Sequence, residues 1–155
     1  YKKSTILRRL LKRMESLKIK SLSDYKLYLE KHHEEYESLF ETILIGVTSF
    51  YRDENAFLSI EEHIKTIIAN KTKGESIRIW TPGCSTGEEA YSIASIIANI
   101  LKEKIVHYHI QIFATDIDEK AIAFARKAVY PNTSNFMFKS IEDSSFLIEK
   151  EDSFE

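Results

Sequence analysis

The chain has one cysteine, two prolines and four glycines among its 155 residues. Of these shortages, that of cysteine excludes the largest number of structural and chemical features. A single thiol, that of Cys84, can neither close an internal disulfide nor supply a zinc site built from several cysteines. His107 and His109 have no acidic or cysteine ligand close by in the sequence, so we expect no metal site. With 43% hydrophobic residues, the chain can instead bury one hydrophobic core, or one small lobe plus part of a larger domain.

Long hydrophobic runs are missing as well. The segment Ile93–Leu101 is interrupted by Ser95 and Asn99, and it is shorter than the roughly 20 apolar residues that a membrane-spanning helix needs. The basic N-terminal segment is not followed by the apolar stretch and small-residue cleavage site of a signal peptide. These absences predict no direct membrane insertion and a cytoplasmic location.

Charge is abundant, and its sign changes along the sequence although the net charge is only −2. The first twenty residues carry eight lysines and arginines against a single glutamate, whereas acidic residues dominate the segment after residue 141. A basic segment of this kind suits an acidic partner. The partner could be nucleic acid, but the segment contains no interleaved aromatic platform and no DNA-reading motif, so a glutamate-rich protein surface fits at least as well, and we expect no nucleic acid. A solvated helix face remains the alternative.

Hydrophobic spacing divides the chain near residue 46. Apolar residues recur at helical intervals as far as Leu44, and Ser23 is the expected N-cap of the second helix. The segment 46–53 interrupts this pattern, and an amphipathic helix follows over 56–68. We therefore predict a helical lobe over 1–46, a linker and amphipathic helix over 47–75, and a partial α/β domain over 76–155.

A β-α-β unit is predicted within the α/β domain. The nearly continuous apolar runs 77–81 and 110–115 are typical of strands buried on both faces, and a helix over 88–102 places small and apolar side chains on one stripe. A crossover of this kind makes the strands parallel and gathers ligand-binding groups at their C-terminal ends. A helix over 119–128 and a short strand at 145–148 are also expected.

The segment with the clearest chemical meaning, Pro82–Glu89, leads from the first strand into the helix. A glycine-rich turn at a helix N-terminus normally binds anions, because free N–H groups and the helix dipole both favour negative charge. Here Glu88 and Glu89 oppose a pyrophosphate, so we predict a positively charged nucleoside, S-adenosylmethionine, in preference to NAD or ATP. Asp116 directly follows the second strand and is expected to bind the ribose hydroxyls. It could instead cap the next helix, but Asp118 is better placed for that task.

Three motifs in this order resemble the CheR-type chemotaxis receptor methyltransferases. They are Thr48–Asp53, Ile79–Ala94 and Phe113–Asp118, and the resemblance extends from Tyr1 to about Pro131. It implies a Rossmann-like methyltransferase sheet preceded by a small all-helical lobe. It also implies S-adenosylmethionine as methyl donor, S-adenosylhomocysteine as product, and glutamates on the cytoplasmic helices of chemotaxis receptors as acceptors.

The resemblance also implies roles for individual residues. The cofactor contacts carried over to this sequence are Thr48, Arg52, Gly83, Gly87, Glu89 and Asp116. Arg52 is the expected catalytic residue: a carboxylate is already ionised at pH 7 and needs no general base, so the guanidinium only has to grip and aim it. On the residues alone, pairing of Arg52 with Asp53 or Glu54 on the surface is the favoured interpretation. Gly46 departs from the family, because many members have an asparagine there that contacts the cofactor.

The helical lobe is expected to dock the receptor, with Arg9, Lys12 and Arg13 facing an acidic helix. Only the first part of a seven-stranded sheet is recognisable, so we expect this chain to be the N-terminal part of a longer protein-glutamate O-methyltransferase, incomplete by itself. The alternative is a non-catalytic module in a signalling protein that binds S-adenosylmethionine or another protein.

Overall fold

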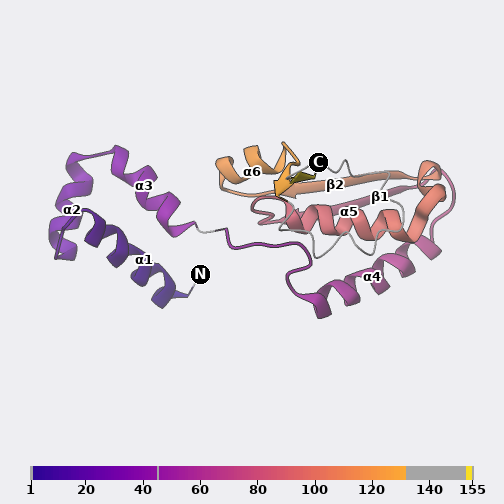
Figure 1. Ribbon diagram of the computed structural model, residues 1–155, viewed down its shortest axis with the longest axis horizontal. Helices are drawn as coiled ribbons and strands as arrows, with labels where there is room; N and C mark the ends of the chain where they lie inside the picture. Colours follow the sequence, from indigo (N-terminus) through magenta and orange to yellow (C-terminus); the bar gives the residue numbers. More distant parts are fainter. Residues whose placement is uncertain (1, 45, 132–152, 155) are drawn as a thin grey trace. The chain divides into compact units, whose positions relative to one another are not determined.

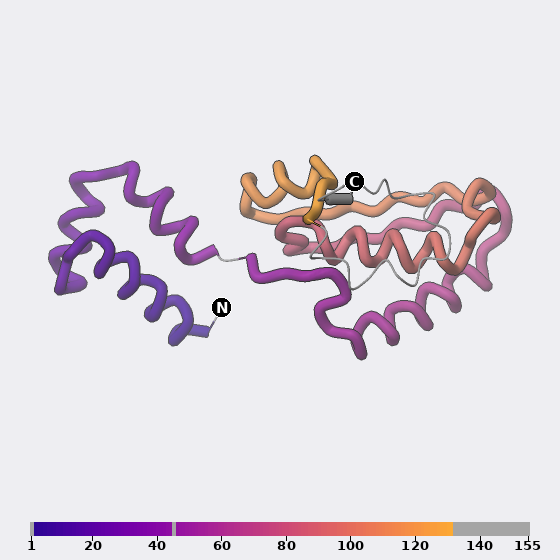
Figure 2. Tube along the Cα trace, viewed as in Figure 1, coloured from indigo at the N-terminus to yellow at the C-terminus, as the bar shows by residue number. Residues whose placement is uncertain are grey.

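The computed structural model describes residues 2–44 and 46–131 and the backbone of residues 153–154 (Figure 1). The chain forms two compact units, Tyr1–Ile45 and Gly46–Glu155. Residues 47–75, predicted as a linker with an amphipathic helix, belong to the second unit. The course of the chain through both units can be followed in Figure 2. The strand expected at 145–148 lies outside the described residues.

The first unit is helical, as predicted, and its described residues, 2–44, form three helices. They are α1 (Lys3–Ser16), α2 (Leu22–Lys31) and α3 (Glu34–Ile43), and Met14 and Tyr25 are buried between them. Ser21 caps α2, its Oγ accepting a hydrogen bond from the backbone N–H of Asp24 at 3.0 Å. The expectation that Ser23 is the cap is wrong, because Ser23 lies inside the helix and a cap must precede its first turn.

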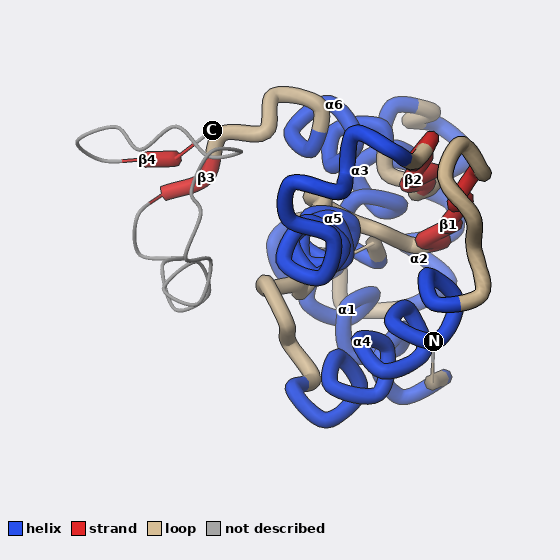
Figure 3. The backbone as a smooth tube through the Cα atoms, turned by 90° about the vertical axis from the view of Figure 1, so that its right-hand side faces the viewer, coloured by secondary structure: helices blue, strands red, loops and turns tan. Residues whose placement is uncertain are grey.

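The second unit begins with a loop and continues through the predicted β-α-β arrangement. Its elements are α4 (Glu54–Ala69), β1 (Ser76–Pro82), α5 (Glu88–Leu101), the 3-10 helix η1 (Lys102–His107), β2 (His109–Thr115), α6 (Glu119–Ala125), β3 (Tyr130–Pro131) and β4 (Ser153–Phe154). β1 and β2 pair in parallel, with Trp80 opposite Phe113, whereas β3 and β4 pair antiparallel. The strands of both pairs are red in Figure 3. The predicted α/β class is confirmed.

The core of the second unit lies on one face of the β1–β2 pair. Buried side chains from α4 and α5 form it, and isoleucines of both strands pack against them; the buried members are Phe57, Ile64, Ile93, Ile96, Ile97 and Leu101. On the opposite face, Trp80 is 66% exposed and Phe113 is 51% exposed. The expectation that both strand faces are buried is therefore wrong for the described residues. A short apolar run does not reveal how many of its faces are covered.

The helix that follows β2 ends earlier than its sequence pattern predicts, whereas the helix that follows β1 does not. α5 ends at Leu101, within one residue of the predicted end, because Lys102 has a φ of +48°, outside the helical range. α6 ends at Ala125 rather than at 128. The backbone hydrogen bonds that follow it join residues three positions apart instead of four, and Ala128 has a φ of +55°. Across residues 2–44 and 46–131, no helix combines the length and the apolarity that crossing a bilayer requires.

Candidate functional site

The turn after β1 is tied to the end of β2. The backbone N–H groups of Gly83 and Cys84 both donate to the carbonyl of Thr115, at 2.7 and 3.0 Å. Gly83 has a φ of +73°, and a Cβ built on it would meet no atom within 4 Å. The left-handed backbone favours glycine at this position. The open space beside Gly83 allows a ligand to approach the main chain closely.

Gly87 is required for a different reason. Its φ is +98°, and a Cβ there would lie 2.8 Å from Tyr130 Oη and 2.9 Å from Ala125 Cβ. Gly87 is itself buried, and it precedes the first residue of α5. Its smallness therefore serves packing within the domain, and its predicted contact with the cofactor stays a prediction.

The two glutamates at the start of α5 differ in their surroundings. Glu88 is half-buried, and its Oε2 accepts a hydrogen bond from Thr86 Oγ1 at 2.6 Å. Glu89 is exposed, and none of the hydrogen bonds or ion pairs within the described ranges involves its carboxylate. Glu89 is therefore the carboxylate that remains available to a positively charged ligand at this helix end.

Asp116, at the end of β2, joins two loops. One oxygen of its carboxylate accepts from the backbone N–H of Ser85 at 2.7 Å, and the other accepts from the N–H of Asp118 at 2.9 Å. Asp118 caps α6 through the N–H groups of Lys120 and Ala121, as predicted. Each carboxylate oxygen of Asp116 can accept a further hydrogen bond. The residue can thus bind ribose hydroxyls while it holds the turn.

The loop 46–53 begins against the same turn. A Cβ built on Gly46 would lie 2.0 Å from Ser85 Oγ, so a larger residue there would have to displace the Ser85 side chain. This contact gives a physical reason why glycine stands at position 46 in this chain. It also places the start of the loop beside the residue whose N–H Asp116 binds.

Thr48 and Arg52 occupy this loop, Thr48 half-buried and Arg52 exposed. Arg52 Nη1 donates to the carbonyl of Val47 within the loop. In the part of the chain that the structure describes, Arg52 forms no ion pair with Asp53 or Glu54, and Asp53 instead caps α4 through the N–H of Ala56. The described contacts of Arg52 therefore do not include the surface ion pair that was the alternative to a role in the site.

Two aromatic residues fix the loop to the rest of the domain. Tyr51 has a φ of +44°; its backbone N–H donates to Ser92 Oγ at 3.1 Å and its hydroxyl donates to Ser95 Oγ at 3.0 Å. Phe50 is 6% exposed and packs edge-to-face on Tyr130, with ring centroids 4.9 Å apart. The sequence gives no signal for Tyr130, because it follows the last recognised motif.

Cys84 has no reactive role in this arrangement. Its side chain is buried, and burial raises the pKa of the thiol, with the negative charge of Asp116 adding to the effect. The thiol is therefore protonated at neutral pH and is a poor nucleophile. Within the described ranges, no three His, Cys, Asp or Glu side chains come together as a metal site.

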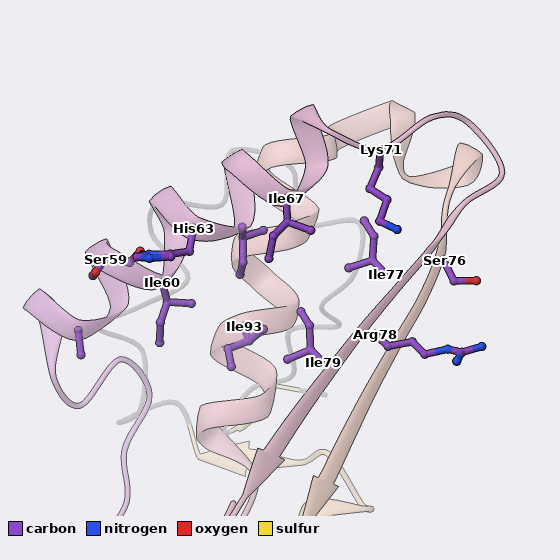
Figure 4. Close-up of a pocket in the computed structure, with 12 residues that line it drawn as sticks. Ser59, Ile60, His63, Ile67, Lys71, Ser76, Ile77, Arg78, Ile79 and Ile93 are labelled. Carbon is purple, nitrogen blue, oxygen red and sulfur yellow. The ribbon is translucent and has the colours of Figure 1, made fainter.

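A groove of the second unit lies elsewhere. It has a volume of about 670 Å³ and lies between α4 and β1, lined by isoleucines from α4, β1 and α5 with His63, Lys71 and Arg78 among them (Figure 4). It follows the N-terminal half of β1, whereas the cofactor turn follows the C-terminal end of that strand. None of the predicted cofactor residues lines it.

The three predicted docking residues on α1 are not equally available. Arg13 forms two hydrogen bonds to Glu35, at 2.8 and 2.6 Å, and Tyr25 donates to the same carboxylate at 2.7 Å. Arg9 Nη1 donates to the carbonyl of Ile43 at the end of α3. Lys12 is exposed. The guanidinium groups of Arg9 and Arg13 thus hold the lobe together, and a docking role for them stays a prediction.

Comparison with known families covers nearly the whole chain. Residues 46–155 match the family model described as the CheR methyltransferase, SAM binding domain. Residues 1–44 match the model described as the CheR methyltransferase, all-alpha domain. The boundary between these two matches falls where the structure divides the chain into its two units.

Individual relatives are similar over most of this chain. An uncharacterized 104.1 kDa protein in the hypE 3′ region of Rhodobacter capsulatus is 34% identical over 86% of the chain, which corresponds to 14% of that protein. A chemotaxis protein methyltransferase of Escherichia coli is 30% identical over 84% of the chain and 43% of its own length. One from Borreliella burgdorferi is 31% identical, over 72% and 41% respectively. The chain spans less than half the length of each of these relatives.

Proposed function

Because the chain belongs to the CheR methyltransferase family, we propose that it is the part of a protein-glutamate O-methyltransferase that holds the methyl donor and docks the substrate. S-adenosylmethionine is the cofactor of the matched domain. In this proposal the acceptors are glutamate side chains on the cytoplasmic helices of a chemotaxis receptor, and the enzyme works in the cytoplasm.

The proposal rests above all on the convergence of three segments at one end of the β1–β2 pair. The turn after β1 exposes its main chain at Gly83, β2 ends in Asp116, and the loop of Thr48 and Arg52 starts against Ser85. The available carboxylate of Glu89 suits an ammonium group, and the remaining acceptor capacity of Asp116 suits a ribose. These groups fit a cationic nucleoside better than a pyrophosphate.

The chemistry asks little of the protein. S-adenosylmethionine, when bound, supplies a methyl group attached to a positively charged sulfur. The acceptor glutamate is ionised at neutral pH, so no residue has to remove a proton from it. The work of this chain is therefore to position the acceptor and to keep water away.

Arg52 is the residue proposed to position the acceptor. Its planar guanidinium can form two parallel hydrogen bonds to a carboxylate. In the structure its Nη1 donates to the Val47 carbonyl, which keeps the exposed side chain close to its own loop. Gripping a substrate carboxylate with the remaining N–H groups would leave that bond in place.

The experiment that tests this function uses the whole protein that carries the sequence. S-adenosylmethionine binding is measured by calorimetry, and methyl transfer to a receptor cytoplasmic fragment is measured as base-labile methyl ester. We expect binding and transfer, with the ester on glutamate. Binding without any transfer would favour the non-catalytic module, and absence of binding would overturn the proposal.

A further inference from the structure

Tyr130 contacts both loops of the proposed site, although it lies outside them. Its side chain is 3% exposed. Its ring packs edge-to-face on Phe50, with ring centroids 4.9 Å apart, and Phe50 belongs to the loop that carries Thr48 and Arg52. Tyr91 and Phe124 also pack edge-to-face on the Tyr130 ring, with ring-centroid distances of 5.7 and 5.5 Å. Edge-to-face pairs of this kind add to the stability gained from burial alone.

The hydroxyl of Tyr130 reaches the cofactor turn. It donates to the carbonyl of Thr86 at 2.6 Å, and the absent Cβ of Gly87 leaves the room that this oxygen occupies. Burial raises the pKa of Tyr130, so the hydroxyl keeps its proton at physiological pH. The peptide between Thr86 and Gly87 leads directly into Glu88 and Glu89, so its position sets where α5 begins.

We propose that Tyr130 is a positioning residue that holds the loop 46–53 and the turn 83–89 in one arrangement. It does so through its ring on one side and its hydroxyl on the other. The inference rests on the proposed function, because the loop carries Arg52 and the turn carries Glu89. Tyr130 itself needs no contact with cofactor or substrate.

If Tyr130 were purely structural, removing its hydroxyl would lower the stability of the domain without a specific effect on the two segments of the site. Tyr91 offers a matched control, because its hydroxyl donates to the carbonyl of Ala125 at 2.9 Å and its ring also contacts Tyr130. Tyr91→Phe therefore removes a comparable hydrogen bond whose acceptor lies in α6. Tyr130→Phe removes the bond to the turn and keeps the ring.

The first test needs neither cofactor nor substrate. In the whole protein, amide hydrogen exchange is measured for the wild type, Tyr130→Phe and Tyr91→Phe. We expect Tyr130→Phe to speed exchange in both 46–53 and 83–89, and Tyr91→Phe to speed it only around α6. Equal changes in the two variants, or no change in either loop, would overturn the inference.

The second test connects the arrangement to activity. Losing one net hydrogen bond at the turn should weaken S-adenosylmethionine binding about three- to tenfold in Tyr130→Phe and leave it nearly unchanged in Tyr91→Phe. We also expect Tyr130→Phe to lower kcat with little change in the KM for the receptor. Equal affinity losses in the two variants would overturn the inference. A wild type that fails to bind the cofactor would instead overturn the proposed function, while hydrogen exchange still decides the role of Tyr130.

Discussion

Asp116 combines a structural contact and a proposed binding role in a single carboxylate. Its oxygens accept hydrogen bonds from the N–H groups of Ser85 and Asp118, and we propose that the same oxygens also bind the ribose hydroxyls. We expect Asp116→Ala in the whole protein to lower S-adenosylmethionine affinity by about 1.5–3 kcal/mol, the usual scale for a hydrogen bond to a charged group. Calorimetric titration measures this loss.

Cys84→Ala is the control for that substitution, since it changes the same turn without removing a charged acceptor. It should alter the affinity far less than Asp116→Ala. Equal losses from the two variants would contradict the assignment of Asp116. Asp116→Ala should also lower the free energy of unfolding, because two N–H groups lose their acceptor, and a denaturant titration separates this effect from binding.

Glu89 permits a cleaner separation of binding from stability. Its carboxylate is exposed and makes no hydrogen bond or ion pair within the described residues, so Glu89→Gln should leave the free energy of unfolding within about 0.5 kcal/mol of the wild type. The affinity for S-adenosylmethionine should fall, because the variant loses the negative charge opposite the cationic ligand. Calorimetry at low and high salt measures the affinity.

Glu88→Gln is the matched change one residue earlier, where the carboxylate already accepts from Thr86. It should perturb the turn and affect binding less than the change at Glu89. A Glu89→Gln variant that bound the cofactor as well as the wild type would remove Glu89 from the site.

The stability of the helical lobe depends on the buried carboxylate of Glu35. The hydrogen bonds from Arg13 lower the pKa of Glu35, with a smaller contribution in the same direction from Tyr25, whereas burial acts in the opposite direction. A lowered folded-state pKa means that the pair stabilises the lobe above the ordinary glutamate pKa of about 4.3. This stability is lost as the pH falls through the lowered value.

Urea unfolding from pH 7 down to pH 3 tests this, with the wild type compared to Glu35→Gln. The wild type should be the more stable at neutral pH, and the difference should shrink below about pH 4.3. Other carboxylates titrate in both proteins, so the difference isolates Glu35. A difference that stayed constant across this range would show that the ion pair contributes no pH-dependent stability.

The basic surface of α1 needs a sharper test than reversal of Arg9, Lys12 and Arg13, because two of these side chains hold the lobe together. Arg8 and Lys12 are both exposed and lie one helical turn apart. We expect Arg8→Glu with Lys12→Glu to impair receptor methylation, and to leave cofactor affinity nearly unchanged. Methylation by the wild type should weaken as salt rises, because ions screen exposed charges beyond about 8 Å at 0.15 M.

Reversal of Lys104 and Lys127 makes the same change of charge in the other unit, and both residues are exposed. This control should methylate the receptor like the wild type. If the two double variants behaved alike, total charge and not the α1 surface would govern docking.

Sequence patterns were informative for elements whose determinants lie close together along the chain. The helices follow from apolar spacing, and the Asp118 cap follows from the two residues just after it. The contacts that assemble the site join distant residues. Tyr130 and Thr86 are 44 residues apart, and Asp116 and Ser85 are 31 apart. No local sequence pattern predicts such pairs. Motifs were therefore enough to single out Asp116 and Arg52, but only the structure shows which residues they contact.

At the scale of the whole molecule, one side of the β1–β2 pair carries the sole tryptophan of the chain. Trp80 is 66% exposed, and its indole N–H donates to Thr115 Oγ1 at 3.0 Å. We therefore expect its fluorescence in the 155-residue chain to be readily quenched by acrylamide. Quenching as weak as that of a buried tryptophan would mean that another surface covers this face. Dilution would then increase the quenching if that surface belongs to a second copy, and would leave it unchanged if the surface belongs to the same chain.

The clamp that Asp116 places on the turn has a thermodynamic consequence. The backbone of Gly83–Ser85 is already held by Thr115 and Asp116 before any ligand arrives. A segment ordered during folding has little conformational entropy left to lose on binding. A larger share of the interaction free energy between the cofactor and the site therefore appears in the binding free energy. The preorganised turn can thus bind a flexible cofactor through a small number of polar contacts.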